Sequence, residues 1–203
     1  LRNVSVYAAF KLVPPALKAL LDSPDVLVDG FILPGHVSTI IGIKPYTFVA
    51  EQYKKPSVVT GFEAKEIIEG ILMIVRQIAS KRAAVEIQYR TVVRPEGNPR
   101  AVELLDRYFE PADAYWRGIG VIPGSGLKLR NQYAAFDAAK KFNPPVSEAA
   151  EPELCSCGDI LRGVKIPTEC ALFGTGCTPE SPVGPCMVST EGSCAAYYKY
   201  GGS

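Results

Sequence analysis

Short apolar runs alternate with helical periodicity along the first 142 residues of the chain. Runs of β-branched and aromatic residues typical of strands occur at residues 4–10, 26–33, 57–60 and 119–123, and residues 84–93 are predicted to be a strand or extended chain. Pro14 and Pro15 follow the first run and suit the first turn of a helix over residues 16–21.

The stretch 64–81 carries the strongest helical signal. Its large apolar residues recur at i, i+3, i+4 and i+7, which predicts one buried face made of Ile67, Ile68, Ile71, Leu72, Val75 and Ile78. A second helix is predicted to start at Asn98 as N-cap, with Pro99 at its first position, and to run through Tyr108. A last helix is predicted over residues 130–141.

Alternating strands and helices with short connections predict an α/β fold, with a mostly parallel sheet and helices on both faces. Two prolines at 144 and 145 interrupt this pattern. The acidic segment after them, residues 146–203, has a net charge of −4, which leaves about +5 for the rest. We therefore expect an α/β cleft domain over residues 1–145 and a small loop-rich domain over residues 146–203.

Three loops follow predicted strands. The loop 34–39 contains His36, the only histidine of the chain, whose ordinary pKa lies near neutrality. From the sequence alone, a hydrogen-bonded histidine near the start of a helix is the simpler explanation for it. The loop 60–63 ends in Glu63, which is also simply explained as a carboxylate at the start of the next helix. The Gly-rich loop 123–126 precedes a predicted helix but lacks the Lys-Ser/Thr of a phosphate loop, so a plain turn is favoured.

Composition excludes several classes of partner. The net charge of +1 gives no broad basic surface for nucleic acid. The chain has no apolar run long enough to span a membrane and no signal-peptide pattern, so no membrane-spanning segment is expected. Because the chain starts with Leu1, we expect a fragment or a processed product.

All six cysteines lie between residues 155 and 194, in the order C-x-C-x12-C-x6-C-x8-C-x7-C. A zinc site usually shows C-x2-C pairs, and a disulfide framework needs an oxidising compartment. A [4Fe-4S] cluster takes four thiolates and would leave two cysteines over. Cys157 can lie beside a cluster held by Cys155 without binding it, because alternate residues of extended chain share a side. The spacing favours the cluster, with zinc and disulfides as alternatives.

The cysteine-rich sequence resembles the hydrogenase maturation factor HypD family. The resemblance rests on residues 155–163 (CSCGDILRG), 167–179 (PTECALFGTGCTP) and 182–198 (PVGPCMVSTEGSCAAYY). Three shorter upstream segments also resemble that family, in the family's order: residues 33–42 (LPGHVSTIIG), 59–63 (VTGFE) and 94–98 (RPEGN).

The resemblance implies a cytoplasmic scaffold that helps to assemble the Fe(CN)2CO unit of [NiFe]-hydrogenases, rather than a conventional turnover enzyme. It implies a HypC-like chaperone and a HypE-like cyanide donor as partners. A free-standing disulfide reductase of the ferredoxin:thioredoxin reductase type is the alternative.

By position in the family motifs, four cysteines are implied to hold a [4Fe-4S] cluster: Cys155, Cys170, Cys177 and Cys194. Cys157 and Cys186 are implied to form a redox-active pair, and His36 and Glu63 to line a cleft that holds the transient Fe(CN)2CO iron. The family also has an N-terminal region with its own cysteine motifs, including the cysteine for that iron. This chain does not contain that region, so we expect only part of the assembly site here.

Overall fold

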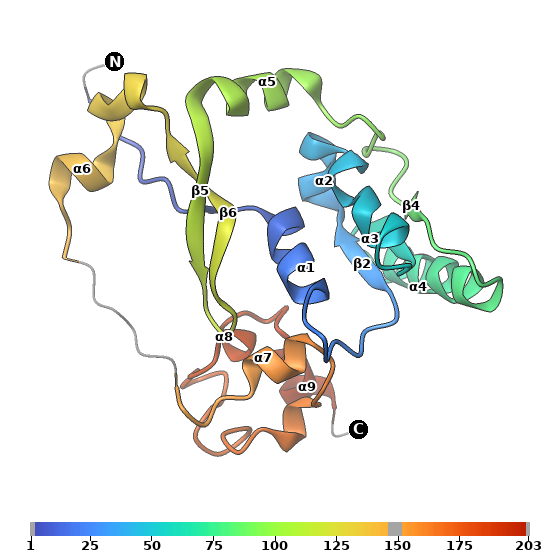
Figure 1. Ribbon diagram of the computed structural model, residues 1–203. Helices are drawn as coiled ribbons and strands as arrows, with labels where there is room; N and C mark the ends of the chain where they lie inside the picture. Colours follow the sequence, from blue (N-terminus) through green and yellow to red (C-terminus); the bar gives the residue numbers. More distant parts are fainter. Residues whose placement is uncertain (1–2, 146–151, 202–203) are drawn as a thin grey trace. The chain divides into compact units, whose positions relative to one another are not determined.

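The computed structural model describes residues 3–145 and 152–201, and it divides into two compact units (Figure 1). One unit comprises Leu1–Leu27, Pro111–Lys128 and Gln132–Ser203, and the other comprises Val28–Glu110 and Leu129–Asn131. The domain boundary predicted at residues 145 and 146 adjoins residues 146–151, which lie outside the described residues, so that boundary stays a prediction.

The second unit is built on a parallel sheet in the order β2-β3-β4, which comprises Phe31–Pro34, Ser57–Thr60 and Val85–Ile87. The β3 strand coincides with its predicted run and β4 falls inside its run, whereas β2 occupies the end of the run 26–33 and extends to Pro34. Pro34 pairs with Thr60 in the register of β2 and β3. The chain segments that leave these two strands therefore start at the same edge of the sheet.

Helices cover this sheet. Val58 and Thr60 of β3 face Gly70 of α4 (Ala64–Ala79), while the intervening Val59 points to the opposite face and is also fully buried. The other helices of the unit are α2 (Gly35–Ile41), the 3-10 helix η1 (Lys44–Tyr46), α3 (Thr47–Glu51) and α5 (Pro99–Tyr108). The α5 helix begins as predicted, because the side chain of Asn98 accepts a hydrogen bond from the Ala101 N–H.

The face of α4 predicted to be buried is largely exposed. The α4 helix itself is confirmed, but five of the six residues on that face are each more than two-fifths exposed: Ile68, Ile71, Leu72, Val75 and Ile78. The buried positions of α4 are Gly70 and Gln77, because the small glycine lets the helix approach Thr60 closely. The periodicity therefore predicts the helix correctly, but it does not predict which side of the helix packs on the sheet.

The first unit contains most of a second three-stranded sheet in the order β1-β6-β5, comprising Phe10–Lys11, Gly120–Leu129 and Phe109–Trp116. The β1 strand pairs antiparallel with β6 and leads into α1 (Val13–Leu21), whose first turn contains prolines as predicted. The run predicted as a strand at residues 4–10 contributes only its last residue to β1. The α/β class is confirmed, with one parallel and one antiparallel sheet.

Two expectations for residues 120–142 are corrected. The loop predicted at residues 123–126 lies inside β6, where the Gly124 N–H donates to the Asp113 carboxylate of β5. The helix predicted over residues 130–141 is divided into the 3-10 helix η2 (Asn131–Phe136) and α6 (Ala138–Phe142). Asp137 separates the two as the N-cap of α6 and accepts from the Ala139 and Lys140 N–H groups.

The cysteine-rich segment is loop-rich, as expected. Its regular elements are the short helices α7 (Cys157–Leu161), η3 (Pro167–Glu169), α8 (Pro185–Val188) and α9 (Ser193–Tyr200). Over the described residues, no helix combines the length and apolar character needed to cross a bilayer.

Candidate functional site

The six cysteines converge on one small cavity in the first unit. Five are buried, and Cys155 is partly buried. All six line the cavity, and apolar side chains complete its wall: Ile160, Leu172, Phe173 and Met187. The core of this region is therefore built largely from thiols, and the residues between the cysteines position them.

Short turns and helices place each thiol. Cys157 starts α7, Cys186 is the second residue of α8, and Cys194 is the second residue of α9. Cys170 follows η3, where the Ile166 N–H donates to the carboxylate of Glu169. Together these elements turn chain segments far apart in the sequence toward one point.

Glycines allow the chain to pass close to two of these cysteines. A Cβ atom at position 184 would lie 2.5 Å from the Cys155 Sγ, and one at position 192 would overlap the Cys186 carbonyl oxygen. Real Cβ atoms do not approach other atoms this closely. The glycines at 184 and 192 are thus required by packing, which explains part of the glycine content of the segment.

Cys157 and Cys186 are in direct contact. The hydrogen bond between their side chains, together with burial, raises the pKa of Cys186 well above its ordinary value. Burial also raises the pKa of Cys155, and it raises that of Cys194 to about 11. Without a metal ion, these three thiols therefore stay protonated at neutral pH.

Cys170 differs from its neighbours. Burial would raise the pKa of Cys170, but hydrogen bonds from Ser156 and from the backbone of Leu172 and Phe173 lower it. The Ser156 N–H lies 3.5 Å from the Cys170 Sγ, and the Val183 N–H lies 3.3 Å from the Cys177 Sγ. Such N–H groups stabilise thiolates and tune any metal that the sulfur atoms bind.

The donor set fits a thiolate-bound cluster. A [4Fe-4S] cluster takes four cysteine thiolates, and six thiols face one cavity here, two of them with backbone N–H groups directed at sulfur. Within residues 3–145 and 152–201, no three His, Cys, Asp or Glu side chains are arranged to hold a metal ion. The fit therefore rests on the kind and number of donors and not on their spacing.

Other residues around the cysteines were not predicted from the sequence. Lys165 Nζ lies 2.8 Å from the Asp159 carboxylate and 3.3 Å from the Ser156 hydroxyl. Arg162 forms ion pairs with Asp159 at 2.7 Å and with Asp25 at 3.3 Å. These contacts hold α7, which carries Cys157, against the segment that follows α1. Spacing alone gives no signal for them, because Asp25 is distant in the sequence.

A second unpredicted feature is the turn between β5 and β6. Gly118 in this turn has φ +83°, and a Cβ atom there would lie 3.2 Å from the Cys157 Sγ. A groove of about 430 Å³ runs beside this turn and is lined by Cys155, Cys157 and Arg162, among others. The turn therefore covers one thiol of the contacting pair next to an open groove.

His36 and Glu63 lie in the second unit, at the edge where β2 and β3 end. The His36 ring lies against Phe62 in a tilted arrangement, with ring centroids 4.6 Å apart and an interplanar angle of 38°. Glu63 is the N-cap residue of α4, and its N–H donates to the Glu66 carboxylate at 3.0 Å. The structure thus brings the two predicted loops together through His36 and Phe62, and it shows Glu63 in a capping role.

Comparison with known proteins identifies the family. The model of the HypD family, described as "Hydrogenase formation hypA family", matches residues 1–201. Hydrogenase maturation factor HypD2 of Bradyrhizobium diazoefficiens is 49% identical over 99% of this chain and 55% of that protein. Hydrogenase maturation factor HypD of Rhodobacter capsulatus is 47% identical over 100% of this chain and 55% of that protein.

The similarity extends to archaea. The putative hydrogenase expression/formation protein MJ0993 of Methanocaldococcus jannaschii is 45% identical over 98% of this chain and 55% of that protein. The chain thus spans about half the length of the curated relatives it matches. The family match and these identities show that this chain belongs to the HypD family.

Proposed function

We propose that this chain acts in hydrogenase maturation, as the cluster-bearing part of a scaffold on which the Fe(CN)2CO iron is assembled. The convergence of six thiols on one cavity, with Cys157 and Cys186 in contact, carries the proposal. The names of the relatives support the maturation role. We place this activity in the cytoplasm.

In this proposal Cys155, Cys170, Cys177 and Cys194 hold a [4Fe-4S] cluster. When bound, such a cluster supplies electrons one at a time. The N–H groups of Ser156 and Val183 donate to the Cys170 and Cys177 sulfurs, and N–H groups placed in this way tune a bound metal. Cys170, Cys177 and Cys194 are buried in this cavity, and Cys155 is partly buried.

Cys157 and Cys186 act as the redox pair. As dithiol they lose two electrons and two protons when they form a disulfide, and they take up the same number when that disulfide is reduced. Because the pKa of Cys186 is raised, this thiol keeps its proton and can donate a hydrogen bond to the Cys157 sulfur. His36 and Glu63 are the other two residues in this proposal. They would face the Fe(CN)2CO iron, which is the substrate.

Partners complete the proposed assembly. A HypC-like chaperone would share the iron, and a HypE-like protein would deliver cyanide to it. Both interactions are to be tested with the full-length protein, because this chain covers about half of its relatives. Copurification of the three proteins is the expected result.

Anaerobic reconstitution with iron and sulfide tests the cluster. We expect a brown protein that contains about four iron and four sulfide per chain. Cys170→Ala should abolish cluster binding, whereas Cys157→Ala should keep the cluster and prevent formation of the intrachain disulfide. A colourless protein that takes up zinc instead, or identical behaviour of the two variants, would contradict the assignment.

The groove beside Cys157 supports a second candidate, a free-standing disulfide reductase. Such an enzyme would reduce a disulfide substrate without a HypC-like partner. Turnover of a model disulfide by the reconstituted full-length protein alone would favour it. Turnover only in the presence of the partner proteins would favour the scaffold.

A further inference from the structure

A pocket of about 450 Å³ lies in the second unit, where α4 ends and the chain turns into β4. It contains none of the cysteines and neither His36 nor Glu63. Six polar or charged residues account for most of its wall: Arg76, Gln77, Ser80, Arg82, Glu86 and Arg90. Nothing in the proposed function uses this pocket.

Gln77 lines this pocket, and its side chain has a buried hydrogen-bond donor without a partner among the described residues. The side chain is 1% exposed, and its Oε1 accepts from the Ala84 N–H at 2.8 Å, which fixes the orientation of the amide. Its Nε2 is buried, and none of the described residues accepts a hydrogen bond from it. A buried donor without a partner is costly, so an oxygen atom of a ligand at this point would be stabilising.

Positive charge surrounds this amide. Arg82 forms an ion pair with Glu86. Within the part of the chain that the structure describes, neither Arg76 nor Arg90 has a carboxylate partner. Arg90 uses only its Nε, which donates to the Ile87 carbonyl oxygen at 3.0 Å. Three guanidinium groups and one carboxylate leave the wall with two positive charges.

The hydroxyl of Ser80 adds no negative charge to the wall of the pocket. It donates to the carbonyl oxygens of Arg76 and Gln77, so it does not supply a carboxylate-like acceptor to balance the arginines. A basic residue in the last turn of a helix is also explained by the helix dipole, which accounts for Arg76. The dipole does not account for Arg90 on the following segment or for the buried Gln77 amide.

We propose that this pocket binds an anionic ligand that presents phosphate or carboxylate oxygens. The guanidinium groups of Arg76 and Arg90 would bind two oxygen atoms of the anion through their paired N–H donors. The Nε2 of Gln77 would donate to a further oxygen and so gain the partner that the protein does not supply. The volume is sufficient for a small organic anion.

Calorimetric titration of the purified full-length chain tests this site, with pyrophosphate and citrate as separate probes in about 0.15 M sodium chloride. We expect saturable binding of at least one probe at one site per chain. Arg76→Gln and Arg90→Gln should each raise Kd at least tenfold. Preference for pyrophosphate would identify a phosphate ligand, and preference for citrate a carboxylate.

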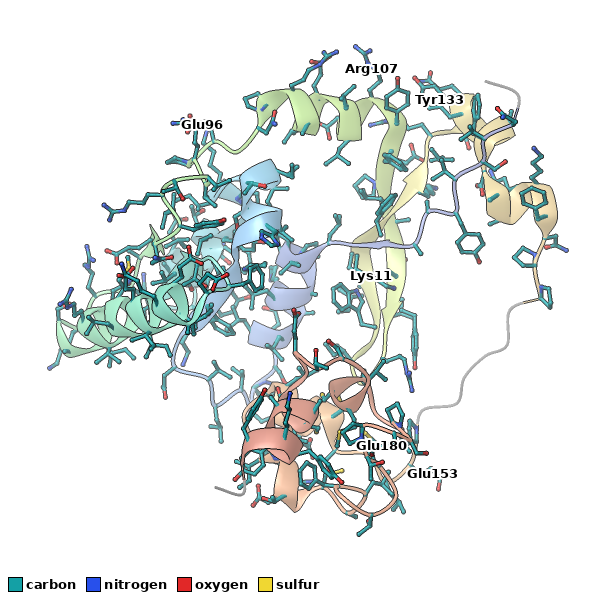
Figure 2. The ribbon with its side chains drawn as sticks, turned by 180° about the vertical axis from the view of Figure 1, so that it is seen from behind. Lys11, Glu96, Arg107, Tyr133, Glu153 and Glu180 are labelled. Atoms are coloured by element: carbon teal, nitrogen blue, oxygen red, sulfur yellow. The ribbon has the colours of Figure 1, made fainter. Side chains whose placement is uncertain are left out.

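Arg107→Gln is the matched control. Arg107 occupies the last turn of α5 (Figure 2), as Arg76 does in α4. It is half exposed and paired with Glu103 at 3.0 Å. The Arg107→Gln variant should bind each probe with the same Kd as the unchanged protein. Thermal unfolding of each variant checks that the fold is retained.

The side-chain amide of Gln77 provides an independent readout. Its nitrogen–proton NMR signals should shift during the titration with the same Kd, because a ligand oxygen reaches Nε2. Absence of saturable binding up to about 10 mM would overturn the proposal. So would equal loss of affinity in Arg107→Gln, or binding that leaves the Gln77 amide signals unmoved.

Discussion

Gly184 lies so close to Cys155 that a Cβ atom at position 184 would be 2.5 Å from the Cys155 Sγ. Gly184→Ala must therefore displace Cys155 from the shared cavity. We expect the variant to lose about 1–3 kcal/mol of unfolding free energy, as other overpacked cores do. Urea denaturation of the reduced protein measures this loss.

Gly176→Ala is the control for Gly184→Ala. A Cβ atom at position 176 would meet only the end of the flexible Leu172 side chain, at 3.3 Å. Gly176→Ala should therefore lower the unfolding free energy clearly less than Gly184→Ala does. Equal losses in the two variants would show that Gly184 is not constrained by the thiol.

The turn that covers Cys157 allows a second matched pair. Gly118 and Gly120 both have positive φ angles, +83° and +100°, so alanine is strained at either position. Only Gly118 faces the Cys157 Sγ; a Cβ atom at position 120 would meet nothing within 4 Å.

We therefore expect Gly118→Ala to push the turn away from Cys157 and to speed alkylation of this thiol by iodoacetamide. Gly120→Ala should destabilise the protein without changing that rate. Mass spectrometry of the alkylated peptides under native conditions gives both rates. An unchanged rate in Gly118→Ala would mean that the turn does not control access to Cys157.

Asp159 should make the stability depend on pH in the acid range. The hydrogen bond from Lys165, with the nearby charge of Arg162, lowers the pKa of Asp159. A lowered folded-state pKa gives stability that is complete above the unfolded pKa of about 3.9 and lost as the pH falls through the folded pKa.

Replacing the carboxylate removes this contribution. In Asp159→Asn, we expect the decrease of unfolding free energy below about pH 4 to be shallower than in the unchanged protein. Urea denaturation between about pH 2.5 and pH 7 measures the difference. An identical pH profile in the variant would exclude a stabilising role for the Asp159–Lys165 pair.

Substitutions on the two sides of α4 should differ in their effect on stability. Ile68 is 66% exposed, so Ile68→Gln should change the unfolding free energy by less than about 0.5 kcal/mol. Gly70→Ala should destabilise, although alanine favours helices, because its methyl group would overlap the Thr60 side chain. Thermal unfolding of both variants distinguishes this packing from the reverse orientation of the helix.

The elements with local signals were predictable. The α5 helix starts where Asn98 caps it, and α4 occupies nearly the whole predicted stretch, because caps and helical periodicity are properties of neighbouring residues. The buried side of α4 was not predictable in the same way. It depends on close approach of Gly70 to another strand, and the larger apolar residues on the exposed side dominate the pattern.

Pairing between distant segments explains the other differences. Residues 123–126 have the composition of a turn, yet β1 and β5 hold them in β6: a Cβ atom at Gly126 would lie 3.2 Å from the Phe10 carbonyl oxygen. The convergence of the cysteines was anticipated because all six fall within forty residues. The contacts of Arg162 with Asp25 and of Gly118 with Cys157 join segments far apart in sequence and had no local signature.

The pairing of Pro34 with Thr60 also makes β3 sensitive to insertions and deletions. Deletion of one residue within β3 would rotate the following side chains to the opposite face, so Val58 and Thr60 would no longer meet Gly70. The same deletion would draw Phe62 back along the strand by about 3.3 Å and away from the His36 ring. Insertions and deletions between Ser57 and Phe62 should therefore be far more damaging than conservative substitutions there.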